Sequence, residues 1–271
     1  MGMKRKNIQV PDHTGRSPNF RPGDGARASA RFNVPIAATT NANPPGIPNR
    51  MLKRRERRAP DRDWLLWQLM DSAFPTGGFV HSAGLEAAWQ HDEVRQRDQL
   101  ISFAEAGLLQ LGHAALPFVT AAHAKPERLP EFDRLCDAFT SNHVANRASR
   151  LQGRAFLTAG QKIFDVRVPE TPCQHLAPVF GASLRCLNVP VETAARMFFF
   201  SHLRGVFAAA VRLNIVGPME AQMLQRRLAP VAENIIADCG TLTIDDIAQT
   251  SPLLDLWQGA HDRLYSRLFQ S

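Results

Sequence analysis

The chain has 271 residues, of which 44% are hydrophobic, and a formal net charge of +7. This length is enough for one substantial core or two small ones, and the apolar share is typical of a globular protein. The charge alone would indicate a nucleic acid or a membrane surface as partner. However, residues 1–60 carry thirteen Lys or Arg against three Asp or Glu, whereas residues 61–271 carry nineteen against twenty-two. The body is therefore mildly acidic, which argues against a basic nucleic-acid groove on it.

Residues 1–60 form a basic extension that is rich in proline. Eight of the nineteen prolines lie there, and the apolar residues follow neither a helical nor an alternating period. The segment has too little apolar surface to offset the entropy of ordering, so it is predicted to be disordered. Two alternatives stay open. Translation could begin at Met51, or the segment could be an organelle transit peptide, although it has no clear amphipathic helix.

Neither a membrane span nor a secretion signal is predicted. The chain has no run of 18 apolar residues and no signal-peptide pattern. Its four cysteines, at positions 136, 173, 186 and 239, include no C-x-x-C pair. Disulfides would be sparse in a chain of this size, so a reducing cytoplasmic location is favoured.

From residue 61 onward, the spacing of apolar residues predicts helices. The first covers residues 64–73 and ends at Phe74-Pro75, because the residue before a proline is pushed out of the helical region. Gly77 and Gly78 predict a turn, and Ser82 is placed as the N-cap of a helix that runs through Trp89. Further helices are predicted over residues 100–122, 130–140 and 146–160.

The second half of the chain continues this pattern, with helices predicted over residues 173–187, 191–213 and 219–237. Charged residues interrupt the most apolar of them, 191–213, so it is interpreted as a core helix. Pro230 predicts a kink and Thr243 caps a short element. No repeat and no βαβ alternation are present. The fold class is therefore all-α, a single compact domain of about eight to ten helices over residues 61–271, preceded by the disordered residues 1–60.

Common catalytic signatures are missing from the sequence. It contains no G-x-x-x-x-G-K-[ST], G-x-G-x-x-G, H-E-x-x-H or EF-hand loop. No lysine follows Gly77 and Gly78, which argues against a phosphate loop. A helical hydrolase that uses Ser82 stays an alternative. Against it, Val80 stands where a nucleophile elbow requires glycine, and the adjacent His81 has poor geometry for a base.

Two further features carry potential chemistry. Cys173-x-His175 could bring a thiolate and an imidazole to one zinc or nickel ion. Two residues are a weak signal, so no metal site is predicted. Glu86 follows His81 and Ser82 by one helical turn, so the three share one face. Its carboxylate could contact the helix start, pair with an arginine or project towards a partner.

Three segments together resemble the urease accessory protein UreF. Asp71-Ser-Ala-Phe-Pro-Thr-Gly-Gly-Phe79 and His81-Ser-Ala-Gly-Leu-Glu86 resemble the N-terminal signature of that family. Ala208-Ala-Ala-Val-Arg-Leu213, with Gly217 and Gln222, resembles a second landmark. Pro252-Leu-Leu-Asp255 and His261-Asp-x-Leu-Tyr-Ser-Arg-Leu-Phe-x-Ser271 resemble the closing motif. The resemblance covers residues 62–271. It departs from the family pattern at Asp262, where glutamate is expected, and at residues 214–216, which lack an expected proline.

The resemblance implies an all-α homodimer without catalytic activity and without a firmly bound cofactor or metal. It implies partnership with a UreD/UreH-like scaffold protein, a UreG-like GTPase and apo-urease, to which the complex delivers nickel while the UreF-like component regulates the GTPase. Nucleic acids and membranes are not expected as partners. The candidates for contact with the GTPase are Glu86, Arg212 and Gln222. The candidates for contact with the scaffold are Tyr265, Arg267, Leu268 and Phe269.

Several alternatives stay open at the level of sequence. The C-terminal tail could be mobile and become ordered on a partner, or it could pack on its own domain. Arg212 could form an ion pair on the helix surface instead of a partner contact. Nucleic-acid binding through the basic residues 1–60 is a further alternative of a different class.

Overall fold

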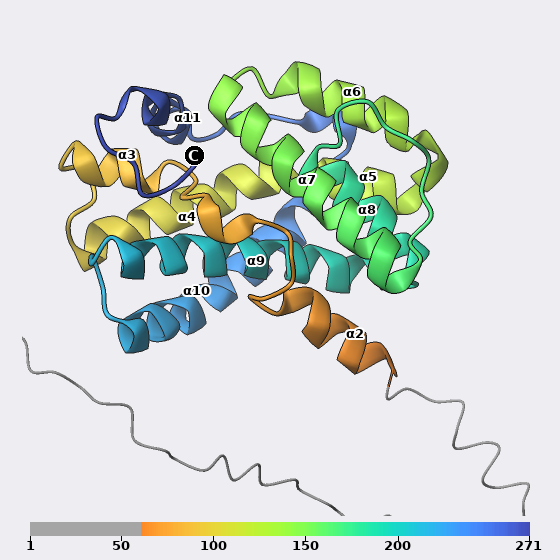
Figure 1. The fold of residues 1–271 in the computed structure, drawn as a ribbon, viewed down its shortest axis with the longest axis horizontal. Coiled ribbons are helices and arrows are strands. Elements are labelled where there is room, and N and C mark those ends of the chain that lie inside the picture. Colours follow the sequence, from red (N-terminus) through yellow and green to blue (C-terminus); the bar gives the residue numbers. More distant parts are fainter. Residues whose placement is uncertain (1–60) are drawn as a thin grey trace, which may run out of the picture. The chain divides into compact units, whose positions relative to one another are not determined.

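The computed structural model of the chain describes residues 61–271, which form one helical unit (Figure 1). The predictions for residues 1–60, namely disorder, a start at Met51, a transit peptide or a nucleic-acid-binding arm, lie outside the described residues. None of the described helices is both long and apolar enough to cross a membrane.

The secondary structure of residues 61–271 consists of α-helices and short 3₁₀ helices, without a strand, which confirms the predicted all-α class. The α-helices are α2 (Asp61–Met70), α3 (Leu85–Gln90), α4 (Arg97–Ala114), α5 (Leu116–Ala124), α6 (Leu129–Phe139), α7 (His143–Phe164), α8 (Leu176–Cys186), α9 (Val191–Arg212), α10 (Pro218–Cys239) and α11 (Pro252–Ala260). The 3₁₀ helices are η1 (Gly78–Val80), η2 (Pro126–Arg128), η3 (Ile244–Asp246) and η4 (His261–Arg263).

Several predicted helix boundaries were wrong. Helix α7, predicted over residues 146–160, covers His143–Phe164 and continues past Gly160. Helix α2 ends at Met70, before the Phe74-Pro75 break, and the Asp71 side chain accepts a hydrogen bond from the Ala73 amide at 2.9 Å in the turn that follows. The predicted helix 100–122 is divided at Ala115, because Pro117 opens α5 and lacks the amide that a continuous helix needs. The predicted helix 173–187 begins only at Leu176.

Helix α9 lies at the centre of this unit and packs against α3, α4, α5, α8 and α10 (Figure 1). Helices α5 to α8 gather on one side of it, and α3, α11 and the C-terminus lie together on another (Figure 1). A row of aromatic rings crosses the core from the α2–η1 segment to α9, with centroid separations of 6.1, 5.0 and 5.3 Å between Phe74, Phe156, Phe180 and Phe198 in turn. These four phenylalanines are buried, and their contacts fix α7, α8 and α9 relative to one another.

Helices α5 and α8 approach so closely that one glycine has no room for a side chain. A Cβ atom added at Gly181 of α8 would overlap the Val119 carbonyl oxygen of α5 and lie 2.9 Å from the Val119 carbonyl carbon. Since backbone atoms cannot move aside as a flexible side chain can, a larger residue there must separate the two helices.

We expect Gly181→Ala to lower the free energy of unfolding by about 2–3 kcal/mol through this overlap. Gly205→Ala is the matched control, because a Cβ at Gly205 in α9 has nothing within 4 Å. The control should be neutral or stabilising by up to about 1 kcal/mol, since alanine favours helix. Urea unfolding measures both values, and equal stability of the two variants would contradict the close approach.

Candidate functional site

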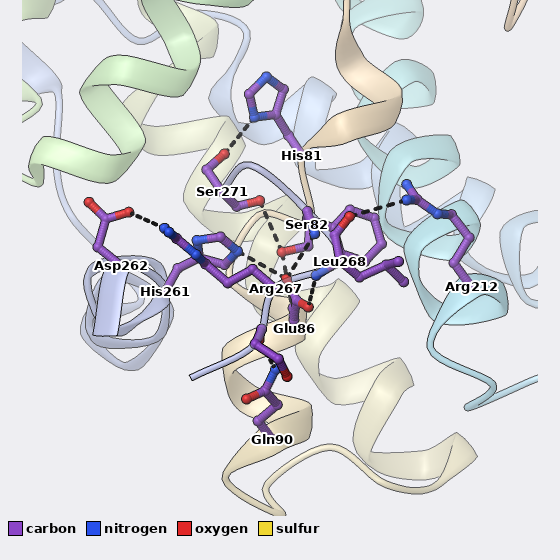
Figure 2. A network of polar contacts seen from close by, with 12 residues as sticks. His81, Ser82, Glu86, Gln90, Arg212, His261, Asp262, Arg267, Leu268 and Ser271 are labelled. Carbon is purple, nitrogen blue, oxygen red and sulfur yellow. Dashed lines mark hydrogen bonds and ion pairs between the residues drawn. The ribbon is translucent and has the colours of Figure 1, made fainter. Parts of the chain in front are cut away.

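The C-terminal tail, residues 264–271, folds back against α3 and the segment that precedes it (Figure 2). The Gln270 amide donates to the Val80 carbonyl at 2.8 Å, and the Ser82 amide donates to the Ser271 carbonyl at 2.5 Å. The Ser82 hydroxyl donates to the same carbonyl at 3.0 Å. The sequence left open whether the tail is mobile or packs on its own domain. In the structure, it packs on its own domain.

The Glu86 carboxylate on α3 is the main anchor of this tail (Figure 2). One oxygen accepts a hydrogen bond from the Leu268 amide at 2.5 Å, and the other accepts from the Phe269 amide at 3.1 Å. The His261 imidazole lies 3.0 Å from the second oxygen through its Nε2. Glu86 is only 2% exposed, so these three donors replace the water that a buried carboxylate needs.

Arg212, at the end of α9, closes the other side of the tail. Its guanidinium donates to the Phe79 carbonyl at 2.7 Å and to the Leu268 carbonyl at 3.3 Å. The same group stacks on two aromatic rings, 4.3 Å from the Phe79 centroid and 4.1 Å from the Phe269 centroid. Arg212 therefore joins η1 to the tail by hydrogen bonds and cation–π contacts. Among the described residues it has no carboxylate partner, so the surface ion pair considered from sequence is not formed.

Besides His261, which contacts Glu86, a second histidine, His81, lies in the interior of this site. His81 Nδ1 lies 2.5 Å from the Ser271 hydroxyl. Burial, together with the neighbouring charges of His261 and Arg147, lowers the pKa of His81 to about 4. The imidazole is consequently neutral near pH 7, which suits a group with little access to water.

An ion-pair cluster borders the site at its surface. Asp262 binds Arg147 of α7 through two contacts of 2.8 and 3.1 Å. It also contacts Arg267 at 3.3 Å, as Figure 2 shows. The hydrogen bond from Arg147 is the largest cause that holds the pKa of Asp262 below its usual value. Asp262, which departs from the family pattern, thus fixes α7 and Arg267 together.

The structure separates the predicted scaffold-facing residues into two groups. Tyr265 is fully exposed, and Arg267 and Leu268 are about half exposed. The Phe269 side chain points inward and is buried against Arg212. The tail therefore presents three of the four predicted residues outward and uses the fourth as an anchor.

The predicted GTPase-facing residues do not form one surface. Glu86 and Arg212 both hold the tail, whereas Gln222 is exposed on α10 and lines a shallow hollow between α9 and α10 with Phe200 and Arg226. The suggestion that Glu86 projects outward does not hold for the described chain, since its carboxylate is buried. Their contact with a GTPase stays a prediction.

The turn before α3 needs one correction. Gly77 has a φ of 70°, a conformation that glycine adopts readily, and Gly78 begins η1, in agreement with the predicted turn after the exposed Pro75. Helix α3, however, begins at Leu85 with Gly84 as its N-cap, so Ser82 is not the cap. The Ser82 hydroxyl still accepts a weak hydrogen bond from the Glu86 amide at 3.4 Å.

This geometry also argues against the hydrolase alternative. The Ser82 side chain is fully buried, and its hydroxyl donates to a backbone carbonyl. Within residues 61–271 no hydrogen bond joins it to a histidine. A serine nucleophile needs both access to substrate and a base within reach.

Several residues of the site were not predicted from the sequence. These residues are His81, His261, Phe79 and Gln90. Gln90 donates a hydrogen bond to the Ser266 carbonyl at 2.8 Å. Each of these residues contacts the tail or lies beside its anchor. The available signal was that the N-terminal signature and the closing motif both contain histidines without any other assigned role.

Comparison with known proteins identifies the family. The UreF family model matches residues 94–229. Urease accessory protein F of Arabidopsis thaliana is 39% identical over 222 residues, which cover 77% of this chain and 92% of that protein. Urease accessory protein F of Oryza sativa subsp. indica is 38% identical over 219 residues, covering 76% and 84% respectively. The chain belongs to the UreF family.

A more distant relative extends the same pattern. The uncharacterized urease accessory protein UreF-like of Schizosaccharomyces pombe is 29% identical over 224 residues, which cover 75% of this chain and 94% of that protein. Membership of the UreF family supports a role in urease maturation. The relatives are named as accessory proteins and not as enzymes, in agreement with the prediction that the chain has no catalytic activity of its own.

Removal of the Glu86 charge should release the tail of this UreF-family chain. We expect Glu86→Gln to lower the free energy of unfolding by about 2–4 kcal/mol, because an amide cannot satisfy three donors as a carboxylate does. Tryptic cleavage after Arg267 should become faster. The matched control is Glu131→Gln, which removes an exposed carboxylate paired with Arg128 and should leave the cleavage rate unchanged. Equal cleavage rates in both variants would exclude Glu86 as the anchor.

Acidification should destabilise the protein through its buried histidines. The pKa of His81 is lowered to about 4 by burial and neighbouring charge, and that of His202 to about 4 by burial. Below pH 6.5 the unfolded chain binds protons that the folded chain excludes, so stability falls between about pH 6.5 and pH 4. We expect each histidine to account for about 2 kcal/mol between pH 7.5 and pH 5. Urea unfolding at pH 7.5 and pH 5 measures this loss. His81→Gln should reduce the difference in the free energy of unfolding between the two pH values. An unchanged pH dependence in that variant would contradict a neutral buried His81.

Proposed function

We propose that this chain is a non-enzymatic chaperone of urease maturation. It acts in the cytoplasm as a homodimer, together with a UreD/UreH-like scaffold protein and a UreG-like GTPase, to deliver nickel into apo-urease. It regulates the GTPase and binds no cofactor firmly, because nickel is handled by the complex. Membership of the UreF family and the relatives' names as urease accessory proteins support this proposal.

The observation that carries the proposal is the way the tail presents its side chains. Tyr265 and Leu268 are apolar or aromatic groups with half or more of their surface exposed, and Arg267 lies between them. Aromatic residues and arginine are enriched at protein interfaces. The backbone beneath them is fixed by Glu86 and Arg212, so a partner that binds there does not have to order the chain first. These features support the tail as the scaffold-binding surface.

For the GTPase, the geometry supports different roles for the three candidates. Gln222 on the exposed face of α10 is proposed as a direct contact. Glu86 and Arg212 are proposed to act indirectly, by fixing the position of the tail and of η1. Arg212 is only partly covered, so it remains accessible at the edge of the tail.

Reconstitution of urease activation tests the whole proposal. Apo-urease, nickel, the scaffold protein and the GTPase are combined with and without this chain, and ureolysis is measured. We expect activation to depend on the chain and the chain alone to show no hydrolase activity. Activation that proceeds equally well without the chain would contradict the proposal.

Tyr265→Ala should weaken scaffold binding without unfolding the protein. The Tyr265 side chain is fully exposed, so its loss removes a partner contact but no internal packing. We expect about 2 kcal/mol of binding free energy to be lost, about 30-fold in Kd, which is typical of an interface hot spot. Trp67→Ala, which truncates an exposed aromatic residue on α2, is the matched control. Calorimetric titration with the scaffold protein measures the Kd of each variant, and equal affinities for the two variants would exclude this use of the tail.

A further inference from the structure

A second cluster of polar side chains lies where α6 meets the loop before α8. It consists of Asp137 on α6 with Cys173 and His175 in that loop. One ligand-type atom from each residue lies within 4.8 Å of the other two. The sequence indicated Cys173-x-His175 only as a weak pair, and the fold supplies the third residue, which comes from a different element.

The spacing of these three groups suits one metal ion. A tetrahedral zinc site has Zn–N and Zn–O bonds of about 2.0 Å and a Zn–S bond of about 2.3 Å, so its ligand atoms lie roughly 3.5 Å apart. His175 Nε2 lies 3.0 Å from Asp137 Oδ1, and no separation in the cluster exceeds 4.8 Å. Metal binding therefore requires the His175–Asp137 pair to separate slightly and the longer separations in the cluster to shorten.

The loop that carries two of these groups is held in place by a buried carboxylate. Asp133, which is fully buried, accepts hydrogen bonds from the amides of Cys173 at 2.7 Å and Gln174 at 2.9 Å through one oxygen. Its other oxygen accepts from the His175 amide at 2.7 Å. The backbone of the loop is thus fixed by Asp133 and not by the side chains of Cys173 and His175.

The groups around the cluster suit metal binding as well. His175 Nδ1 lies 3.1 Å from the Ser149 hydroxyl, which can accept as well as donate a hydrogen bond. If Nε2 binds a metal, Nδ1–H donates to Ser149, which is the outer-shell arrangement typical of histidine ligands. Asp137 is oriented by Asn146, whose amide donates to it at 3.0 Å.

The charge around the cluster is compatible with a divalent cation. Asp137 and a Cys173 thiolate together offer two negative charges, and His175 adds a neutral donor. The Arg150 guanidinium lies 4.0 Å from Asp137 and is the nearest competing cation. Its side chain is 41% exposed, so it can turn towards solvent when a metal binds.

We propose that Asp137, Cys173 and His175 form a three-ligand site for a divalent cation of the zinc class, with water as the fourth ligand. The combination of thiolate, imidazole and carboxylate favours Zn²⁺, and three protein ligands leave one coordination position open. This site does not depend on the proposed role in urease maturation. It revises the expectation that the chain itself binds no metal, which rested on only two of the three ligands.

Titration of the purified full chain with Co²⁺ alone, and then with Zn²⁺, tests the site. Bound Co²⁺ reports a thiolate ligand by a sulfur-to-metal charge-transfer band, and Zn²⁺ affinity is measured by competition with a chromophoric chelator. We expect one Co²⁺ per chain to give this band and Zn²⁺ to displace it. Cys173→Ser should abolish the band and weaken Zn²⁺ binding by more than about 100-fold, beyond the 10–100-fold typical of an outer-shell change. Ser149→Ala should weaken it by about tenfold.

Cys186→Ser is the matched control, because Cys186 is an exposed thiol outside the cluster, and it should retain both signals. Circular dichroism checks the fold of each variant. If Cys173→Ser does not fold, the nearly isosteric Asp137→Asn takes its place and should weaken Zn²⁺ binding at least tenfold. No charge-transfer band, a band that survives in Cys173→Ser, or an equal loss in Cys186→Ser would overturn the proposal.

Discussion

The structure of the candidate site depends on one buried carboxylate. Glu86 is almost completely shielded from water, and a charge in that position is stable only if hydrogen-bond donors replace its hydration. Its donors come from the C-terminal part of the chain, from the Leu268 and Phe269 amides and from His261. Consequently the start of α3 and the C-terminal tail stabilise each other. Arg212 supplements this contact by stacking between Phe79 and Phe269.

This constraint suits the proposed use of the eight-residue tail as a binding surface. A free tail would lose conformational entropy upon binding, which lowers affinity. Here Glu86 already fixes the backbone of the tail, while the side chains of Tyr265 and Leu268 face solvent. Membership of the UreF family supports a role in urease maturation, and the scaffold-binding role of this surface is our proposal. The buried Ser82, predicted from the sequence as a helix N-cap and as a nucleophile only in the hydrolase alternative, belongs to the same structural contact.

The fold was largely predictable from the sequence, whereas the site was not. Apolar spacing located the long helices α7 and α10, each of which buries an apolar stripe. High apolar content located the core helix α9, which packs against helices on several sides. Boundaries failed where a single side chain intervened, as at Pro117 and Asp71. The partners of Glu86 lie 175 to 183 positions away, and no local pattern indicates a contact over that separation. In the same way, Cys173 and His175 were visible as a pair, but Asp137, 38 positions before His175, became a neighbour only through packing of α6 against α8.

Amide hydrogen exchange of the tail in the isolated wild-type chain tests the central claim most directly. If Glu86 holds the tail closed, the Leu268 and Phe269 amides are hydrogen-bonded to its carboxylate and should exchange much more slowly than amides of an unstructured peptide. The Tyr265 amide, which lies outside the contact, should exchange faster. Exchange of Leu268 and Phe269 at the rate of an unstructured peptide would contradict the account, because the tail would then be free before any partner binds.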